Sequence, residues 1–208
     1  MPEMILPNHS PNHLVGKKPA GKVKENTRME LAACAAQFFA QQGYHGTSTQ
    51  AIAQQCQIRK ASLFHHYKTK EDIALAAIKY VHDECVQHIF KYAEDVNTDT
   101  ELRITNFLQA CEQFFSERVE GLLPTLLGLE LSETQVFTQA VENYFQAWVD
   151  SVTTLLQPLH NNIEFTQQLA QQSVTRIQGH LVTARIQQNQ QQFAVLSNEL
   201  RQMWLKPA

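Results

Sequence analysis

Glycine and proline, the residues that most often interrupt helices, are scarce in this chain of 208 residues, which contains seven of each. Four of the prolines lie near the N-terminus, at Pro2, Pro7, Pro11 and Pro19. The long interior is therefore nearly free of helix-breaking residues. Its apolar residues recur at three- and four-residue steps, without the alternation typical of strands, so the sequence predicts an all-α fold of about nine helices.

Long apolar runs are also lacking. No stretch of about 18 apolar residues occurs, and the N-terminus does not show the basic segment followed by an apolar segment that marks a secretion signal. These absences predict a cytoplasmic protein without a membrane partner. Because there is no Gly-rich phosphate loop and no nucleophile placed beside a base, neither enzymatic activity nor a cofactor is expected.

Cysteine occurs at four positions: Cys34, Cys56, Cys85 and Cys111. None of them has CxxC spacing, which predicts reduced, buried thiols and no disulfide framework. A metal site at His82, Cys85 and His88 is the alternative to core packing, but a span of six residues is poorly suited to one helix face. No metal site is therefore predicted. Cys111 lies among phenylalanines, so an inert thiol is favoured over a redox sensor.

Charge is unevenly distributed along the chain. Residues 1–70 contain nine Lys or Arg against three Glu, a net charge of +6. Residues 71–208 contain eight basic against 17 acidic residues, a net charge of −9, and the two parts give the overall −3. A basic N-terminal third favours a polyanionic partner for that part of the chain alone.

Capping signals mark several helix boundaries. Gly43 is suited to the position just after a helix, and Ser48 to the N-cap of a short helix of about two turns. Thr69 and Asp72 form the acidic variant of a capping box, which predicts a long helix ending near Tyr92. Later helices are expected at about 100–119, 122–132, 134–157, 163–188 and 190–204.

Two short helices between Ser48 and Thr69 predict a helix-turn-helix, in which the second helix enters the DNA major groove. Their inward faces are expected to hold Ile52, Ala53 and Cys56, and then Leu63, Phe64 and Tyr67. The predicted base contacts are the outward residues Lys60, Ala61, Ser62 and His65. The predicted phosphate contacts are Ser48, Thr49, Arg59, His66, Tyr67 and Lys70. Additional backbone or minor-groove contacts are expected from Lys17, Lys18, Lys22 and Lys24.

The run "AIAQQCQIRKASLFHHYKTKED" resembles the signature of tetracycline-repressor (TetR) family transcriptional regulators. The elements of that signature are Ile52-Ala53 before the turn, Leu63-Phe64-His65-His66-Tyr67 in the recognition helix, and Lys70-Glu71 at the start of the next helix. The resemblance spans about residues 24–75. Gln57 and Arg59 stand where the family commonly has Gly in the turn and Ser or Thr as the cap, so a strained or reshaped turn is expected.

This resemblance implies a homodimeric, ligand-responsive regulator, in most family members a repressor, that binds a pseudo-palindromic operator in double-stranded DNA. A small hydrophobic or aromatic effector is expected to release it. The implied organisation is a flexible basic arm at 1–21, a DNA-binding domain at 22–69, and an effector-binding and dimerisation domain at 70–208. The alternative is a nucleoid or cell-division factor of the same fold that binds a protein partner and no effector.

Two further sets of residues follow from the resemblance. Those expected to line an effector pocket are Phe107, Cys111, Phe115, Phe145, Trp148, Arg176 and His180. The last two helices carry more apolar residues than a terminal pair needs to bury within one chain, which predicts a dimer interface. Its residues are Leu181, Ala184, Phe193, Leu196, Leu200 and Trp204.

Overall fold

The computed structural model describes residues 20–118, 121, 123–130, 135–187 and 193–206. Within these ranges the chain forms helices and no strand, which confirms the predicted all-α fold. Most of the predicted arm, including Lys17 and Lys18, lies outside the described residues. Its last two positions, Ala20 and Gly21, already belong to the first helix.

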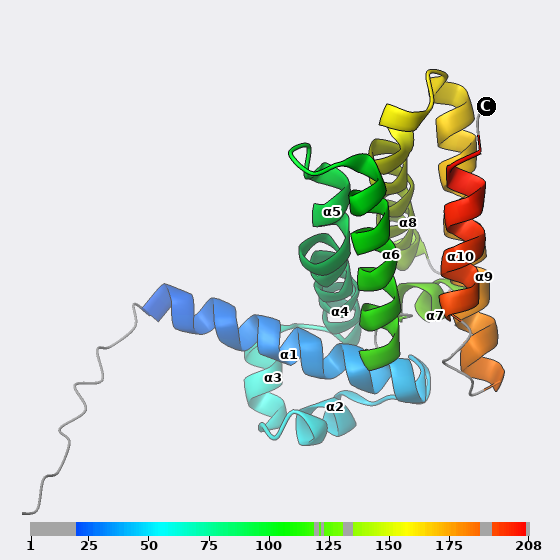
Figure 1. Cartoon of the computed structure of the whole chain (residues 1–208). Coiled ribbons are helices and arrows are strands. Elements are labelled where there is room, and N and C mark those ends of the chain that lie inside the picture. The colour runs from blue at the N-terminus through cyan, green and yellow to red at the C-terminus, as the bar shows by residue number, and fades with distance from the viewer. Residues whose placement is uncertain (1–19, 119–120, 122, 131–134, 188–192, 207–208) are drawn as a thin grey trace, which may run out of the picture.

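The first three helices form a small head, drawn in blue and cyan in Figure 1. They are α1 (Ala20–Gln42), α2 (Thr49–Gln55) and α3 (Lys60–His66). Figure 1 shows α1 lying across the lower end of the upright helices, with α2 and α3 below it, on the side of α1 that faces away from those helices. The head has its own apolar centre, because Phe39, Ile52 and Leu63 are each at most 1% exposed.

The remaining helices form a body. They are α4 (Lys70–Cys85), η1 (Val86–Phe90), α5 (Lys91–Glu94), α6 (Thr100–Glu117), α7 (Leu123–Glu130), α8 (Gln135–Leu156), η3 (Gln157–Leu159), α9 (Ile163–Gln187) and α10 (Phe193–Trp204). Helix α9 packs along α8, and α10 packs against both α9 and α6 (Figure 1). When the uninterrupted α4, η1 and α5 are taken as one helix, the described residues hold nine helices and the short 3-10 turn η3.

The capping signals act as predicted. Ser48 Oγ accepts a hydrogen bond from the Ala51 amide at 3.1 Å, and the Thr69–Asp72 capping box is complete in both directions. Gly43 has a φ of +73°, in the left-handed region that favours glycine, and its amide donates to the Phe39 carbonyl at 2.8 Å. The long helix after Thr69 differs from the prediction in one respect, since its turn Val86–Phe90 is a π-helix.

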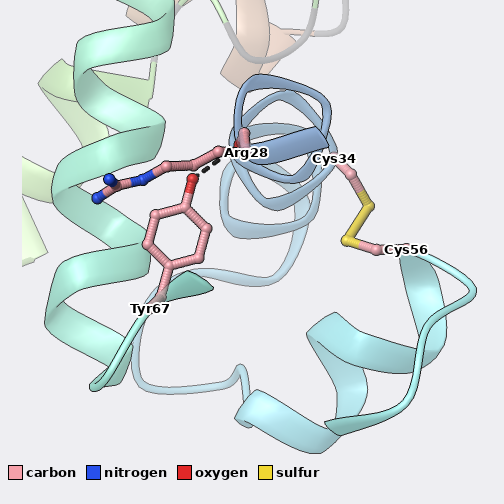
Figure 2. The surroundings of a disulfide bond; sticks show 4 residues. All are labelled: Arg28, Cys34, Cys56 and Tyr67. Carbon is pink, nitrogen blue, oxygen red and sulfur yellow. Dashed lines mark hydrogen bonds between the residues drawn. A yellow bond between two sulfur atoms is a disulfide. The ribbon is translucent and has the colours of Figure 1, made fainter. Parts of the chain in front are cut away.

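The expectation of four reduced cysteines is wrong for two of them. Cys34 of α1 and Cys56, the C-cap of α2, form a disulfide, with their Cα atoms 5.8 Å apart (Figure 2). Their sequence separation of 22 gives no indication of pairing, because the contact arises only when α2 packs on α1. Cys85 and Cys111 are free and buried, as expected.

Candidate nucleic-acid interface

The turn between α2 and α3 has a strained backbone, which is one of the two alternatives that the sequence left open. Gln57 has a φ of +56° and is the one non-glycine residue with positive φ among those described. For a non-glycine residue this conformation costs about 1–2 kcal/mol. Arg59 follows as the N-cap of α3 and makes no side-chain capping bond. The free backbone N–H groups at the start of α3 therefore receive no hydrogen bond acceptor from the side chain of their cap residue.

Helix α3 presents a polar face outward, as expected for a recognition helix. All four predicted base contacts, Lys60, Ala61, Ser62 and His65, are exposed. The face is fixed in orientation from behind, because Leu63 is completely buried in the head. A cation, a small side chain, a hydroxyl and an imidazole therefore share one exposed surface, which suits hydrogen bonding to base edges.

Phe64 lies on the outside of α3, although the sequence pattern placed it inward. Its side chain is 39% exposed, and the Lys60 ammonium lies 5.7 Å from the centre of its ring. An exposed phenylalanine on a recognition helix is suited to contact with a thymine methyl group. The signal in the sequence was its position one residue after Leu63, which turns it about 100° away from the buried side of the helix.

The predicted phosphate contacts fall into two groups. Ser48 and Arg59 are exposed, and Thr49 and His66 are half-buried at the edge of the same surface. Tyr67 is turned inward instead: it is 2% exposed, and its hydroxyl donates to the Arg28 carbonyl at 2.8 Å. Burial raises the pKa of this hydroxyl. Tyr67 therefore braces α3 against α1 and does not face the phosphates.

Lys70 is also directed toward the protein. Its ammonium donates to the Tyr44 carbonyl at 2.5 Å and lies 4.1 Å from the centre of the Tyr44 ring. Desolvation lowers the pKa of Lys70, opposed by the charge of Glu130. In this orientation the side chain fixes the loop between α1 and α2, and only its remaining N–H groups are left for a phosphate.

The same loop is held by a residue that sequence analysis missed. Glu130, at the end of α7, accepts hydrogen bonds from the backbone amides of Tyr44 at 2.8 Å and His45 at 2.7 Å. The Tyr44 ring also packs edge-on against Phe137 of α8, with centroids 5.4 Å apart. The body therefore contacts the head at the α1–α2 loop, through the hydrogen bonds of Glu130 and the packing of Phe137.

Three of the residues assigned to an effector pocket meet in the body, and a fourth is buried on the same helix as two of them. The Trp148 ring stacks on Phe115 and packs edge-on against Phe107, and Cys111 is completely buried. Phe145 is half-buried beside Tyr144. Arg176 does not join this cluster, because it is exposed on α9, and His180 packs instead against the Phe193 ring. The expectation that Arg176 lines the effector pocket is therefore wrong.

A separate cleft of about 330 Å³ lies along η1, α5 and α6. Polar and aromatic residues line it together, among them His88, Lys91, Tyr92, Gln113, Phe114 and Arg118. Arg118 forms an ion pair with Glu84 at its edge. His88 is exposed whereas Cys85 is buried, so the two do not face one site, and no metal-binding cluster of His, Cys, Asp or Glu occurs among the described residues.

The residues assigned to the dimer interface are buried within the single chain. Leu181, Ala184, Phe193 and Leu196 are 5–7% exposed, and Leu200 and Trp204 are not exposed at all. The Trp204 indole N–H donates to Ser173 Oγ at 2.7 Å, which gives this side chain a partner inside the body. The reasoning that these residues exceed what one chain can bury is wrong, because α10 packs against both α6 and α9.

The geometry defines the class of architecture: an all-helical protein whose basic head carries a helix-turn-helix, with a larger helical body behind it. Comparison with known proteins agrees. Residues 31–77 match the family model of bacterial regulatory proteins of the tetR family. The helix-turn-helix head is therefore that of bacterial regulatory proteins of the tetR family, and the helical body behind it has the fold of solved TetR regulators. No helix among the described residues is long and apolar enough to cross a membrane.

Two curated relatives and one solved structure illustrate the similarity. YuxN, an uncharacterised HTH-type transcriptional regulator of Bacillus subtilis, is 35% identical over 68 residues, which is 33% of this chain and 22% of YuxN. The HTH-type transcriptional activator FasR of Mycolicibacterium smegmatis is 25% identical over 147 residues, 67% of this chain and 66% of FasR. Each match spans less than two thirds of the relative. A TetR regulator from Legionella pneumophila superposes with a TM-score of 0.74 at 19% identity, over 83% of this chain and 94% of that chain.

Proposed function

We propose that the protein binds a pseudo-palindromic operator as a homodimer, represses transcription from it, and is released by a small hydrophobic or aromatic effector. It acts in the cytoplasm, by binding and not by catalysis. The observation that carries the proposal is the exposed face of α3. Its residues Lys60, Ala61, Ser62 and His65 do not belong to the buried core and are open to contact with DNA. The division into a DNA-binding domain at 22–69 and a body at 70–208 is part of the same proposal.

Each head contributes base and phosphate contacts of different kinds. Lys60 supplies a donor for a guanine edge, and Ala61 and Phe64 supply apolar contact with thymine. Ser48, Thr49, Arg59 and His66 supply phosphate contacts that fix the register. In a dimer, two such heads meet successive major grooves, which lie about 34–36 Å apart on one side of B-DNA.

The DNA-binding part is tested by fluorescence anisotropy with DNA from upstream of the protein's own gene, against scrambled DNA, at two salt concentrations. Lys60→Ala is expected to weaken operator binding about tenfold and to reduce its preference over scrambled DNA. The matched control is Lys79→Ala, because Lys79 is an exposed cation on α4 paired with Asp83. Equal losses in the two variants would show that α3 does not provide the specific contacts.

Dimerisation is proposed to use the exposed sides of the last two helices. Because the six predicted residues are buried, the contact must involve exposed neighbours such as Ile186, which is 76% exposed, and Val195, which is 62% exposed. Analytical ultracentrifugation is expected to give a dimer for the wild type and a monomer for the Ile186→Glu, Val195→Glu double variant. The matched Val96→Glu, Leu102→Glu double variant should leave the dimer intact, because Val96 is exposed in the loop after α5 and Leu102 in the first turn of α6.

The effector is proposed to bind next to the aromatic cluster around Trp148. Only two tryptophans are present, and both are buried. Fluorescence of the Trp204→Phe variant therefore reports on Trp148 alone, and an aromatic effector is expected to change it while lowering operator affinity. If operator binding is specific but no compound in a broad aromatic and hydrophobic set changes either signal, a regulator with a protein partner and no effector is favoured.

The direction of regulation needs its own test, because FasR is named as an activator. A reporter gene placed downstream of the operator is expected to be expressed more strongly when the gene for this protein is deleted. Lower expression after deletion would assign activation.

A further inference from the structure

The Cys34–Cys56 disulfide lies beside the turn that positions the recognition helix (Figure 2). Cys34 belongs to α1, and Cys56 comes one residue before Gln57 with its positive φ. The bond therefore ties the start of this turn to α1. Both cysteines are half-buried, so neither is sealed in the core, and a small thiol or disulfide in solution has a route to them.

The far end of α3 is attached to the same helix. The Tyr67 hydroxyl donates to the Arg28 carbonyl, a hydrogen bond drawn as a dashed line in Figure 2, over a distance of 2.8 Å. The Arg28 guanidinium lies 5.1 Å from the centre of the Tyr67 ring. Helix α3 is thus bounded by two attachments to α1, a covalent one before it and a noncovalent one after it. Only the covalent attachment can be opened by reduction.

The other two cysteines have a different environment. Cys85 and Cys111 are completely buried, which raises the pKa of the Cys85 thiol to about 12 and that of Cys111 well above its usual value. Thiols that stay protonated react slowly with disulfides and oxidants. The chain therefore holds one accessible cysteine pair and two inert thiols.

We propose that Cys34 and Cys56 form a reversible thiol–disulfide site, oxidised by a low-molecular-weight disulfide of the glutathione class, and that closing the bond strengthens operator binding. The inference rests on the proposed function, because a protein that binds an operator works beside DNA in a reducing compartment. Disulfides of proteins in such compartments are usually transient, catalytic or redox-sensing.

The reaction consists of two exchange steps. One cysteine thiolate attacks a sulfur of glutathione disulfide, which forms a protein–glutathione mixed disulfide and expels one glutathione thiolate. The thiolate of the second cysteine then attacks the protein sulfur, closes the Cys34–Cys56 bond and expels the second glutathione thiolate. The cysteine pair loses two electrons and two protons, and glutathione disulfide gains them as it becomes two thiols.

The direction of the effect follows from the position of the bond. Ile52, Ala53 and Leu63 are fully buried in the head, so we expect the reduced head to remain folded on this apolar centre. Without the bond, the turn from Cys56 to Arg59 gains freedom that it must lose again on binding DNA. A binding surface that is already ordered avoids this loss and binds more tightly.

The first experiment measures the redox equilibrium alone. The full-length protein is equilibrated in buffers of varied reduced and oxidised glutathione, quenched with acid, unfolded, and labelled with a maleimide that adds mass to each thiol. Four labels are expected in reducing buffer and two in oxidising buffer, since the chain has four cysteines and two of them are free in the disulfide form. A label count that stays constant over the whole range would overturn the reversible site.

The second experiment measures operator affinity by anisotropy for the two forms of the same protein. The oxidised form is expected to bind at least about threefold more tightly than the reduced form. Cys34→Ser and Cys56→Ser should each match the reduced wild type in both buffers, whereas Cys85→Ala should keep the redox response. Equal affinity of the two wild-type forms, or tighter binding by the reduced form, would overturn the effect on DNA binding.

The two experiments separate this inference from the proposed function. If neither form binds the operator, the proposed function fails and the effect on DNA binding fails with it. The label count is independent of DNA, so it still decides whether Cys34 and Cys56 form a reversible site.

Discussion

The two hydrogen bonds that Glu130 of the body accepts from the α1–α2 loop give a prediction about how body and head are joined. Its two carboxylate oxygens accept hydrogen bonds from successive backbone amides, those of Tyr44 and His45. A hydrogen bond to a charged group is worth about 1.5–3 kcal/mol when well formed and buried. Because Glu130 is exposed, solvent reduces this value, and we expect about 1–2 kcal/mol for the pair of bonds together.

Glu130→Ala is therefore expected to lower the free energy of unfolding by about 1–2 kcal/mol. For a chain of this size, the melting temperature should fall by roughly 2–8 °C. Glu130→Gln should lose less, because its amide oxygen can still accept one of the two bonds. Circular dichroism during thermal and urea unfolding measures both changes.

The matched control is Glu142→Ala, which removes another exposed carboxylate, this time on α8. It should change the free energy of unfolding by less than about 0.5 kcal/mol. The reasoning is refuted if Glu130→Ala and Glu142→Ala have the same stability. It is also refuted if Glu130→Gln is as destabilised as Glu130→Ala, since that would mean the retained acceptor oxygen contributes nothing.

Three further predictions concern the turn, a helix cap and the buried thiols. Gln57→Gly should raise the free energy of unfolding by up to about 1 kcal/mol in urea denaturation, because glycine relieves the positive φ, whereas Gln57→Ala should not. Thr69→Ala should lower it by about 1 kcal/mol through loss of the capping bond to Asp72. Cys85 and Cys111 should resist iodoacetamide at pH 8 until the protein is unfolded, as counted by mass spectrometry. Burial raises the pKa of Cys85 to about 12, so the folded state holds this thiol proton more tightly than the unfolded state does. The resulting contribution to the free energy of unfolding is complete below pH 9 and should decline between pH 9 and 12.

Local signals in the sequence predicted the local features of the fold. The Ser48 cap, the Gly43 helix end and the Thr69–Asp72 capping box are each made between residues no more than four positions apart. All three are present in the structure. The sequence left a strained turn and a reshaped turn as alternatives, and the positive φ of Gln57 in the structure decides for the strained one. Lys60, Ala61, Ser62 and His65 were predicted to face outward from the helical period, whereas Phe64 was wrongly placed inward.

Features that depend on distant contacts were not predictable in this way. Tyr67 has the residue type of a phosphate contact, but its hydroxyl is taken by a carbonyl 39 residues earlier. The Cys34–Cys56 bond and the grip of Glu130, 86 residues from Tyr44, likewise depend on how helices pack. Trp204 was assigned to an interface because no partner for it is visible in the sequence, whereas α6 and α9 enclose it in the fold.

The π-helical turn Val86–Phe90 has a consequence for any coordinated movement of this molecule. Before it, α4 packs on α1 of the head; after it, α5 packs on α6 and α8 of the body. A π-turn holds one more residue than an α-turn, so the apolar stripe downstream is rotated relative to the stripe upstream. The continuous helix made of α4, η1 and α5 therefore turns one side toward the head in its first part and a different side toward α6 and α8 in its last part. Deleting one residue within 86–90 would turn α5 by about 100° relative to α4, so the contacts of α4 with α1 and those of α5 with α6 and α8 could no longer form together.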